Sequence, residues 1–303
     1  MLAAAAVSPF VDEVVLLDKE TSLGRSGSEG ELHERFTAAG CDLAQRARMR
    51  KGVPQYIQSH GLLCRGAVEM LLPGWHKFIE GLGGVTTTPG RWKTFSKGQW
   101  MHYPEDPSGL FTLPCCGAPI AAAWKDGYAK DWDGIYICAT APVTRGGLVQ
   151  KIETGILLCG VFGYSKDQPP HDEQGFTEFV ASLEVNDVYE AIKDAETLRE
   201  PVSYSGMTNL RRLYEDIPMP GGLAVVGDSL AGFNPVYGQG ISVAAMEAEA
   251  LRKLLQEKLT EAGSVRVTAA DLGSLAVQYQ AKAKHIVDFP FSLSSGMYSL
   301  MDP

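Results

Sequence analysis

The clearest hydrophobic pattern in the chain is a short apolar run followed by a helical one. Leu223–Val226 is a continuous apolar stretch, as a fully buried strand shows. Gly227 ends the run, and Asp228 follows at the tip of the predicted strand. Apolar residues then recur at the spacing of one helix face, at Ile241, Ala244, Ala248, Leu251 and Leu255. The pattern predicts a strand, a glycine-rich turn and a long helix.

The start of the chain shows a second strand pattern. Ala3–Ala6 favours a helix, and Val14–Leu17 is another apolar run typical of a buried strand, closed by Asp18. In a dinucleotide-binding unit, an acid at the end of such a strand binds the adenosine ribose. Asp18 is therefore a candidate cofactor ligand, and a solvated strand end is the alternative interpretation.

Apolar runs predict strands at 135–139 and 155–163, with Arg145–Gly147 as the turn between them. Asp172 is placed to begin one helix, and Asn186 or Asp187 to begin the next.

Two further helices are predicted near the ends of the chain. Helical spacing runs through 62–81, and Pro73-Gly74 divides it. Near the C-terminus, Thr268-x-x-Asp271 has the form of a capping box, so we expect a helix that stops before Pro290.

The composition is that of a globular protein, with 45% hydrophobic and 21% charged residues among 303. The net charge of -9 argues against a nucleic-acid partner, and no apolar run is long enough to span a membrane. The first residues lack the basic start of a signal peptide, so we expect a cytoplasmic protein. The 6 cysteines are irregularly spaced and are interpreted as reduced thiols without a zinc site.

The stretch after Asp228 has the chemistry of a ligand site. Asn234-Pro235 turns the chain, and Gly238 and Gly240 remove side chains from the loop, so that a flat or anionic group can approach the backbone. The helix that follows presents free N–H groups and a partial positive charge. With an acid beside it to accept hydrogen bonds from hydroxyl groups, the site suits a ligand with a polyol and an electron-rich part.

The ordered string Gly227-Asp228-Ser229 and Asn234-Pro235-x-x-Gly238-Gln239-Gly240 resembles the second flavin-binding motif of FAD-dependent monooxygenases, the family around para-hydroxybenzoate hydroxylase and squalene epoxidase. The resemblance implies that Asp228 holds the ribityl hydroxyls of FAD. It also implies that the loop and the helix start flank the isoalloxazine ring, through Pro235, Gly238, Gln239, Gly240 and Ile241. Ser229 stands where the family more often has alanine.

A second segment carries the same resemblance. Arg50 and Gln55, with Gly52-Val53-Pro54 between them and His60 after them, are similar to a segment over the cofactor and substrate channel in a bacterial and algal branch of the family. Arg50 and Gln55 are therefore candidate FAD contacts. A solvated basic loop is the alternative.

The resemblance implies an α/β fold: an incomplete Rossmann-like FAD-binding domain with an inserted substrate domain that has a mixed or antiparallel sheet. We expect 1–90 and 207–290 to form the FAD-binding domain, 91–206 the substrate domain and 291–303 a tail. The sequence departs from the family in lacking the glycine-rich first motif, G-x-G-x-x-G, and a middle segment with Asp-Ala-Thr-Gly. We therefore expect a chain shortened relative to the family, which also leaves organellar targeting open.

The resemblance implies an FAD-dependent oxidoreductase of the monooxygenase type, with NADPH or NADH as reductant and an apolar or aromatic small-molecule substrate. The sequence identifies no catalytic acid or base. One alternative is a serine hydrolase with Ser229 as nucleophile, but Lys282 stands three residues before His285, where that family has an acid. Another is a cofactor-free relative that serves as a binding or scaffold module.

Overall fold

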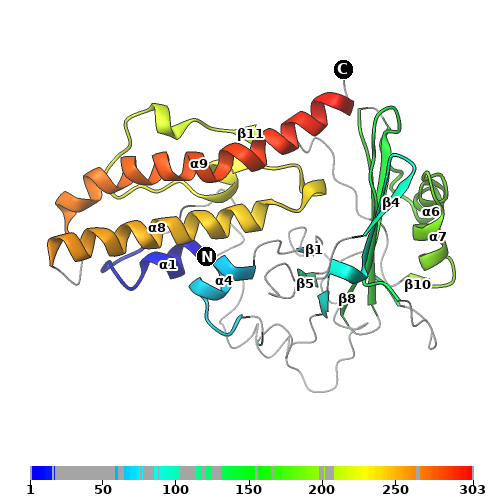
Figure 1. Cartoon of the computed structure of the whole chain (residues 1–303), viewed down its shortest axis with the longest axis horizontal. Coiled ribbons are helices and arrows are strands. Elements are labelled where there is room, and N and C mark those ends of the chain that lie inside the picture. Colours follow the sequence, from blue (N-terminus) through cyan, green and yellow to red (C-terminus); the bar gives the residue numbers. More distant parts are fainter. Residues whose placement is uncertain are drawn as a thin grey trace.

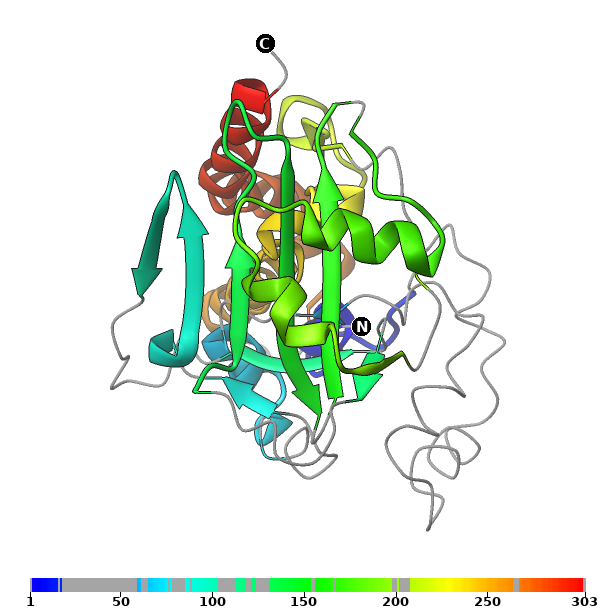
Figure 2. The same ribbon diagram turned by 90° about the vertical axis from the view of Figure 1, so that its right-hand side faces the viewer.

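The computed structural model describes residues 2–15, 17, 59–60, 65–75, 77, 85–87, 89–102, 113–117, 121–123, 131–153, 156–165, 167–197, 201, 208–263 and 267–301. These residues form a mixed α/β structure with two parts. A twisted sheet stands between two short helices on its outer face and a pair of long helices on the other side (Figures 1 and 2).

The sheet has seven strands within the described residues, in the order β10-β6-β9-β8-β7-β3-β4. Along the chain these are β3 (Trp92–Ser96), β4 (Gln99–His102), β6 (Ala121–Ala123), β7 (Gly134–Ile137), β8 (Arg145–Glu153), β9 (Ile156–Gly163) and β10 (Glu196–Thr197). β3 and β7 run parallel, and the other neighbours are antiparallel. The mixed sheet expected for the middle of the chain is present.

The outer face of the sheet is covered by α6 (Glu173–Ala181) and α7 (Asp187–Ile192). Side chains alternate between the two faces of a strand, so Ile135 and Ile137 of β7 point into the core beneath these helices. Asp172 caps α6 as predicted, because its Oδ1 accepts a hydrogen bond of 2.8 Å from the Gly175 amide. α7 begins after Asn186, whose side chain makes no capping hydrogen bond.

The second part is built on α8 (Gly240–Ala262) and α9 (Ala269–Met301), which pack along each other. Leu251, Leu255 and Tyr279 lie in the core between them. Two short helices, α1 (Leu2–Val7) and α4 (Arg65–Leu71), pack against α8. The helices predicted at the start of the chain and after Gly240 are both present.

Several short elements complete the described fold. A three-stranded sheet has the order β1-β5-β2, and a two-stranded sheet joins β11 to β12. The strands are β1 (Ser59–His60), β2 (Val85–Thr87), β5 (Leu113–Gly117), β11 (Leu210–Arg211) and β12 (Ala231–Gly232). Single turns of 3₁₀ helix are η3 (Pro89–Arg91), η4 (Tyr214–Asp216), η5 (Gly227–Ser229) and η6 (Pro235–Tyr237).

The strands predicted at Val14–Leu17 and Leu223–Val226 are wrong. Val15 and Leu17 are 69% and 81% exposed and belong to no strand. Leu223–Val226 is not a strand either, although Val226 has an extended backbone. Among the described residues no strand pairs with either run. An apolar sequence is not sufficient for a strand, because a strand also needs a hydrogen-bonded partner. Val225 instead packs against the core of the two long helices.

The predicted turn at Arg145–Gly147 is also wrong, because these residues begin β8. The chain turns earlier, where Thr140 and Val143 form an isolated bridge. The two glycines serve close packing: a side chain at Gly146 would collide with the Phe162 ring, and one at Gly147 with Leu183.

The expected helix end before Pro290 is wrong, since α9 continues through Pro290 to Met301. Proline removes one backbone hydrogen bond from a helix. Contacts on both sides offset that loss: Val287 is fully buried, and the Phe291 ring meets Phe233 edge-on at 6.2 Å. The predicted start is confirmed, because Asp271 Oδ2 accepts hydrogen bonds from the Thr268 amide at 3.0 Å and hydroxyl at 2.6 Å.

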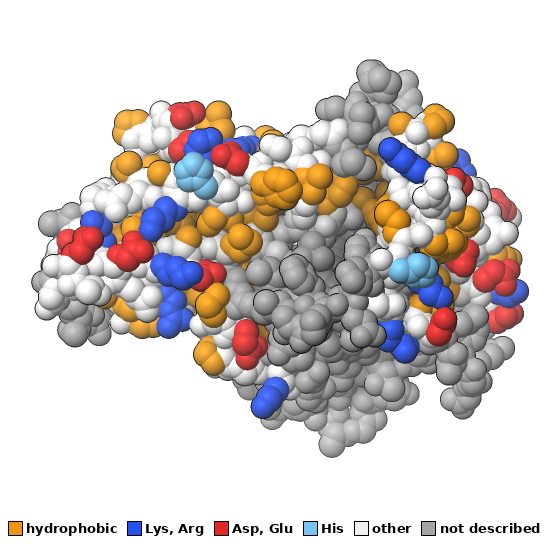
Figure 3. All heavy atoms as spheres, in the orientation of Figure 1, with side chains coloured by type: hydrophobic (Ala, Val, Ile, Leu, Met, Phe, Trp, Pro, Cys, Tyr) orange, Lys and Arg blue, Asp and Glu red, His pale blue; other side chains and the backbone are white. Residues whose placement is uncertain are grey.

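Large apolar side chains are exposed on α9 at Val277, Phe289 and Leu293, and apolar atoms are visible along this helix in Figure 3. None of the described helices is at once long enough and apolar enough to cross a bilayer.

The packing of β9 gives a test of the fold. A side chain at Gly163 would collide with the backbone carbonyl of Asp167, whereas one at Gly160 would meet only Leu148 Cγ at 3.8 Å. We expect Gly163→Ala to lower the free energy of unfolding by about 3 kcal/mol, because backbone must move. Gly160→Ala, on the same strand, should change it by less than about 1 kcal/mol. Urea denaturation of the two variants measures the difference, and equal losses would contradict the described packing.

Candidate functional site

The predicted site begins at η5, a tight turn in which Gly227 has a φ of 60°. This left-handed conformation favours glycine, because any Cβ would be strained there. The turn leaves the Asp228 side chain exposed, so its carboxylate is open to a ligand. Arg212 stabilises the turn, because its guanidinium donates hydrogen bonds to the backbone carbonyls of Asp228 at 3.2 Å and Ser229 at 3.3 Å.

The turn η5 packs against the first two turns of α8. A methyl group at Gly227 would lie 3.8 Å from Cβ of Ala244. The Gly227 amide donates a hydrogen bond of 2.6 Å to Oε2 of Glu247, two turns into the helix. This contact fixes the backbone next to Asp228 relative to α8.

Glu247 is fully buried, although it is a carboxylic acid. Burial raises its pKa to about 7, the Gly227 hydrogen bond lowers it, and the nearby charge of Asp228 raises it further. Within the described residues its Oε1 and the buried hydroxyl of Tyr279 have no hydrogen-bond partner. Burial, and then the charge of Glu247, raise the pKa of Tyr279.

The shifted pKa links Glu247 to stability. A raised pKa means that the folded chain holds the proton more tightly than the unfolded chain, in which the group keeps its ordinary value of 4.5. This group therefore lowers the free energy of unfolding as the pH rises from about 4.5 to about 7, and the loss is complete above the folded pKa.

The loop before α8 contains the turn predicted at Asn234-Pro235, and the structure adds a left-handed glycine at Gly238. Asn234 Oδ1 accepts a hydrogen bond of 3.1 Å from the Val236 amide, and Pro235 opens η6. Gly238 ends η6 with a φ of 63°. Gln239 then occupies the N-cap position of α8, and its side chain makes no capping hydrogen bond.

Two glycines of this loop have room for a small group. Among the described residues, no atom lies within 4 Å of a Cβ added at Gly238 or Gly240. The first N–H groups of α8 point out of the helix without an intrahelical acceptor, and they carry its partial positive charge. Oε1 of Gln239 is buried and lacks a hydrogen-bond partner among the described residues. The site therefore combines two glycines without a described atom near their Cβ positions, a helix N-terminus and the exposed carboxylate of Asp228.

Aromatic side chains join this loop to the inner face of the sheet. The Tyr136 hydroxyl of β7 donates a hydrogen bond of 3.4 Å to the Val236 carbonyl. The hydroxyls of Tyr164 and Tyr237 lie 3.0 Å apart and share a hydrogen bond. Phe162 of β9 stacks on Tyr136, with 5.9 Å between ring centroids. The face of the sheet opposite α6 and α7 therefore meets η6 through aromatic rings.

A second set of contacts holds the loop from the side of α9. β11 pairs with β12, so that Leu210 lies opposite Gly232. Oδ1 of Asn209 accepts hydrogen bonds from the Asn234 amide at 2.8 Å and the Ser294 hydroxyl at 2.7 Å. One partly buried amide oxygen thus ties the proline turn to α9.

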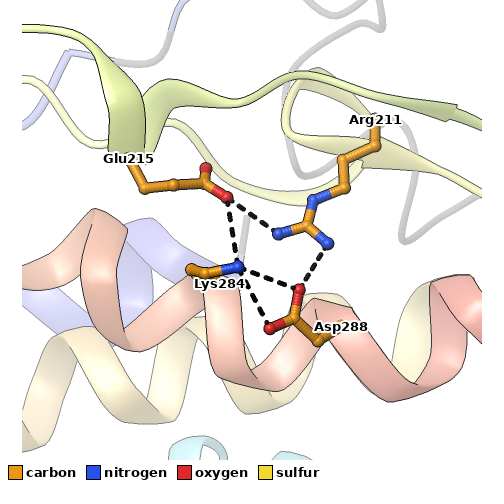
Figure 4. A network of polar contacts seen from close by, with 4 residues as sticks. All are labelled: Arg211, Glu215, Lys284 and Asp288. Carbon is orange, nitrogen blue, oxygen red and sulfur yellow. Dashed lines mark hydrogen bonds and ion pairs between the residues drawn. The ribbon is translucent and has the colours of Figure 1, made fainter.

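A network of ion pairs fastens the segment that contains β11 and η4 to α9 (Figure 4). Arg211 donates to Asp288 at 2.5 Å and to Glu215 at 2.8 Å. Lys284 contacts Asp288 at 3.3 Å and Glu215 at 4.0 Å. The Arg211 and Glu215 side chains are only 13% and 8% exposed, so these charges depend on each other.

The structure brings together the residues predicted on the motif. Gly227 and Asp228 lie on η5, Pro235 on η6, and the residues Gly238, Gln239, Gly240 and Ile241 between η6 and the first turn of α8. Asp18, Arg50 and Gln55 lie outside the described residues.

Sequence reasoning missed Glu247 and Asn209. Glu247 follows Ala244 by three residues and so lies on the predicted buried face of the helix. An acid on a face of the helix that is predicted to be buried is unusual, so the sequence pattern could have identified Glu247 as a candidate. Asn209 carried no comparable signal, because its partners are distant in sequence.

The sequence matches no protein-family model and no curated protein. Among solved structures, the chain is similar to a tetrameric form of 2-methyl-3-hydroxypyridine-5-carboxylic acid oxygenase. The identity is 14%, the match covers 80% of each chain, and the TM-score is 0.48. At this TM-score the likeness carries no argument about the site.

The part of the chain that the structure describes contains no group of three or more His, Cys, Asp or Glu side chains placed to hold a metal ion. Cys138 and Cys159 are free thiols, and burial raises the pKa of Cys159 to about 12. A thiol of this kind is a poor nucleophile at neutral pH.

The ion-pair network predicts unequal effects of its two cations. Arg211→Ala should lower the free energy of unfolding by about 2 kcal/mol, because it leaves the buried Glu215 carboxylate with one distant cation. Lys284→Ala should cost less than about 1 kcal/mol, because Lys284 is 43% exposed. Thermal or urea unfolding of both variants measures this, and a larger loss for Lys284→Ala would contradict the assignment.

Proposed function

We propose that this chain binds FAD and is a flavin-dependent oxidoreductase of the monooxygenase type. One observation carries the proposal: Asp228 is exposed on a left-handed turn that is hydrogen-bonded to α8, next to a loop in which a Cβ at Gly238 or Gly240 would meet no described atom within 4 Å. A carboxylate of this kind accepts hydrogen bonds from a polyol, and the helix start attracts an electron-rich ring edge.

In this proposal, Asp228 accepts hydrogen bonds from the ribityl hydroxyls. The backbone of Gly238 and Gly240 lies against the ring, with Pro235, Gln239 and Ile241 around it. Asp18, Arg50 and Gln55 are proposed as further cofactor contacts from the family resemblance alone. The same resemblance assigns 1–90 with 207–290 to the cofactor and 91–206 to the substrate.

The proposed substrate is an apolar or aromatic small molecule. The support is the aromatic group of Tyr136, Phe162, Tyr164 and Tyr237, which lies where the sheet meets η6. Aromatic rings favour planar, apolar ligands, and the tyrosine hydroxyls add hydrogen-bonding groups. FAD, when bound, supplies electron transfer from NADH or NADPH and the activation of oxygen. The chain's own part is to bind, to orient and to exclude water.

A second candidate is a cofactor-free binding module. It is favoured by the exposure of Val15 and Leu17, because the acid after this run is the proposed ribose ligand and the run is not in a sheet. The two candidates differ in one measurement, which is whether the purified chain takes up FAD and shows flavin absorbance.

The role of Asp228 predicts a loss of cofactor affinity on substitution. Asp228→Asn should weaken FAD binding roughly 10- to 100-fold, since hydrogen bonds to a charged acceptor are lost. Asp216→Asn, which changes an exposed acid on η4, is the matched control and should bind like the wild type. Titration of flavin fluorescence gives both dissociation constants. Equal affinities for wild type and Asp228→Asn would refute the assignment.

The open space at the helix start predicts a second effect. A Cβ at Gly240 would meet no described atom within 4 Å, so we expect Gly240→Leu to change stability by less than about 1 kcal/mol. The side chain would fill the space proposed for the ring, so FAD affinity should fall at least tenfold. Gly273→Leu on α9, where a Cβ also meets no atom within 4 Å, is the control. Unchanged FAD binding by Gly240→Leu would place the ring elsewhere.

A further inference from the structure

The buried carboxyl group of Glu247 has a specific partner and one unsatisfied atom. Oε2 accepts the hydrogen bond from the Gly227 amide at 2.6 Å, whereas Oε1 has no partner within the described residues. Burying an acid is unfavourable in free energy, and a hydrophobic side chain at this position between helices would avoid that penalty. Its single hydrogen bond goes to the turn that carries Asp228.

We propose that Glu247 is a positioning residue for the cofactor site: it holds the Gly227 amide, sets the place of Asp228, and makes the strength of cofactor binding depend on pH. This inference rests on the proposed function, because Asp228 is the residue through which it acts.

The physical link is the η5 turn itself. Gly227 and Asp228 are neighbours, so a hydrogen bond to the amide of Gly227 fixes the backbone from which the Asp228 side chain extends. An ionised acceptor makes a shorter and stronger hydrogen bond than a neutral one. The turn should therefore be held more firmly when Glu247 is charged, and less firmly when it is protonated.

The surroundings of Glu247 contain few other groups that can titrate. Asp228 faces it from η5, and Tyr279 from α9. α1 has no titratable side chain, and in α4 the carboxyl of Glu69 accepts a hydrogen bond from the Gly74 amide. Tyr279 stays protonated across neutral pH because burial raises its pKa. Among the described groups that face it, a change near neutrality therefore belongs to Glu247, whose pKa burial raises to about 7.

The first experiment measures FAD affinity from pH 5.5 to 8.5 for four proteins, using the full chain. The wild type should bind severalfold more tightly above pH 7 than below it. Glu247→Gln keeps an acceptor oxygen but no charge, so it should match the acid limb of the wild type without a step. Glu247→Ala removes the acceptor and should bind about tenfold more weakly at all pH values.

Glu249→Gln is the matched control. Glu249 lies on the same helix and pairs with Lys253, so the substitution removes a carboxylate that has no described contact with Gly227. It should keep the pH step of the wild type. A pH step that survives in Glu247→Gln, or a wild type whose affinity is the same at all pH values, would overturn the proposal.

The second experiment needs no flavin and separates the two proposals. The NMR shift of the Gly227 amide proton, followed against pH in the flavin-free chain, should show a step near pH 7 in the wild type and none in Glu247→Gln. Without that step, the inference about Glu247 fails, whatever the chain binds. With the step but no FAD uptake by the wild type, the turn is coupled to Glu247 and the proposed cofactor function is the part that fails.

Discussion

The hydrogen bond between the Gly227 amide and the Glu247 carboxyl joins a tight turn to a helix that begins thirteen residues later in the chain. It brings the exposed Asp228 beside the first turns of α8. The arrangement requires a buried acid, and one of its oxygens has no hydrogen-bond partner among the described residues. Burying such a polar group is unfavourable. Burial opposes the charge of this group while the amide favours it, and the pKa of Glu247 is raised to about 7.

The loop between this turn and the helix is held from two directions. Tyr136 and Tyr164 reach it from the sheet, and Asn209 ties it to α9. A loop that carries a ligand site needs this support, since short polar turns have little core of their own. The aromatic contacts also bring the inner face of the sheet next to η6, the turn that precedes Gly238 and Gly240.

Local signals in the sequence identified the elements that depend on local physics. The apolar spacing after Gly240 gave α8, the Thr268–Asp271 pair gave the start of α9, and Asp172 gave the start of α6. The turn at Asn234-Pro235 followed from the proline and the asparagine that caps it. The predictions failed where the structure of a segment depends on residues that are distant in sequence. Leu223–Val226 is apolar enough for a strand, yet no strand pairs with it in the described structure, and α9 passes Pro290 because Phe291 packs beyond it.

The sequence by itself determined the order of turn, loop and helix around Asp228, because glycine conformation, helix capping and apolar periodicity act between residues a few positions apart. Only the tertiary structure decided what surrounds them. Glu247 meets Gly227 across twenty residues, and Tyr136 meets Val236 across one hundred. Such partners are set by how whole elements pack, and the energy of a buried charge or hydrogen bond exists only after that packing has excluded water.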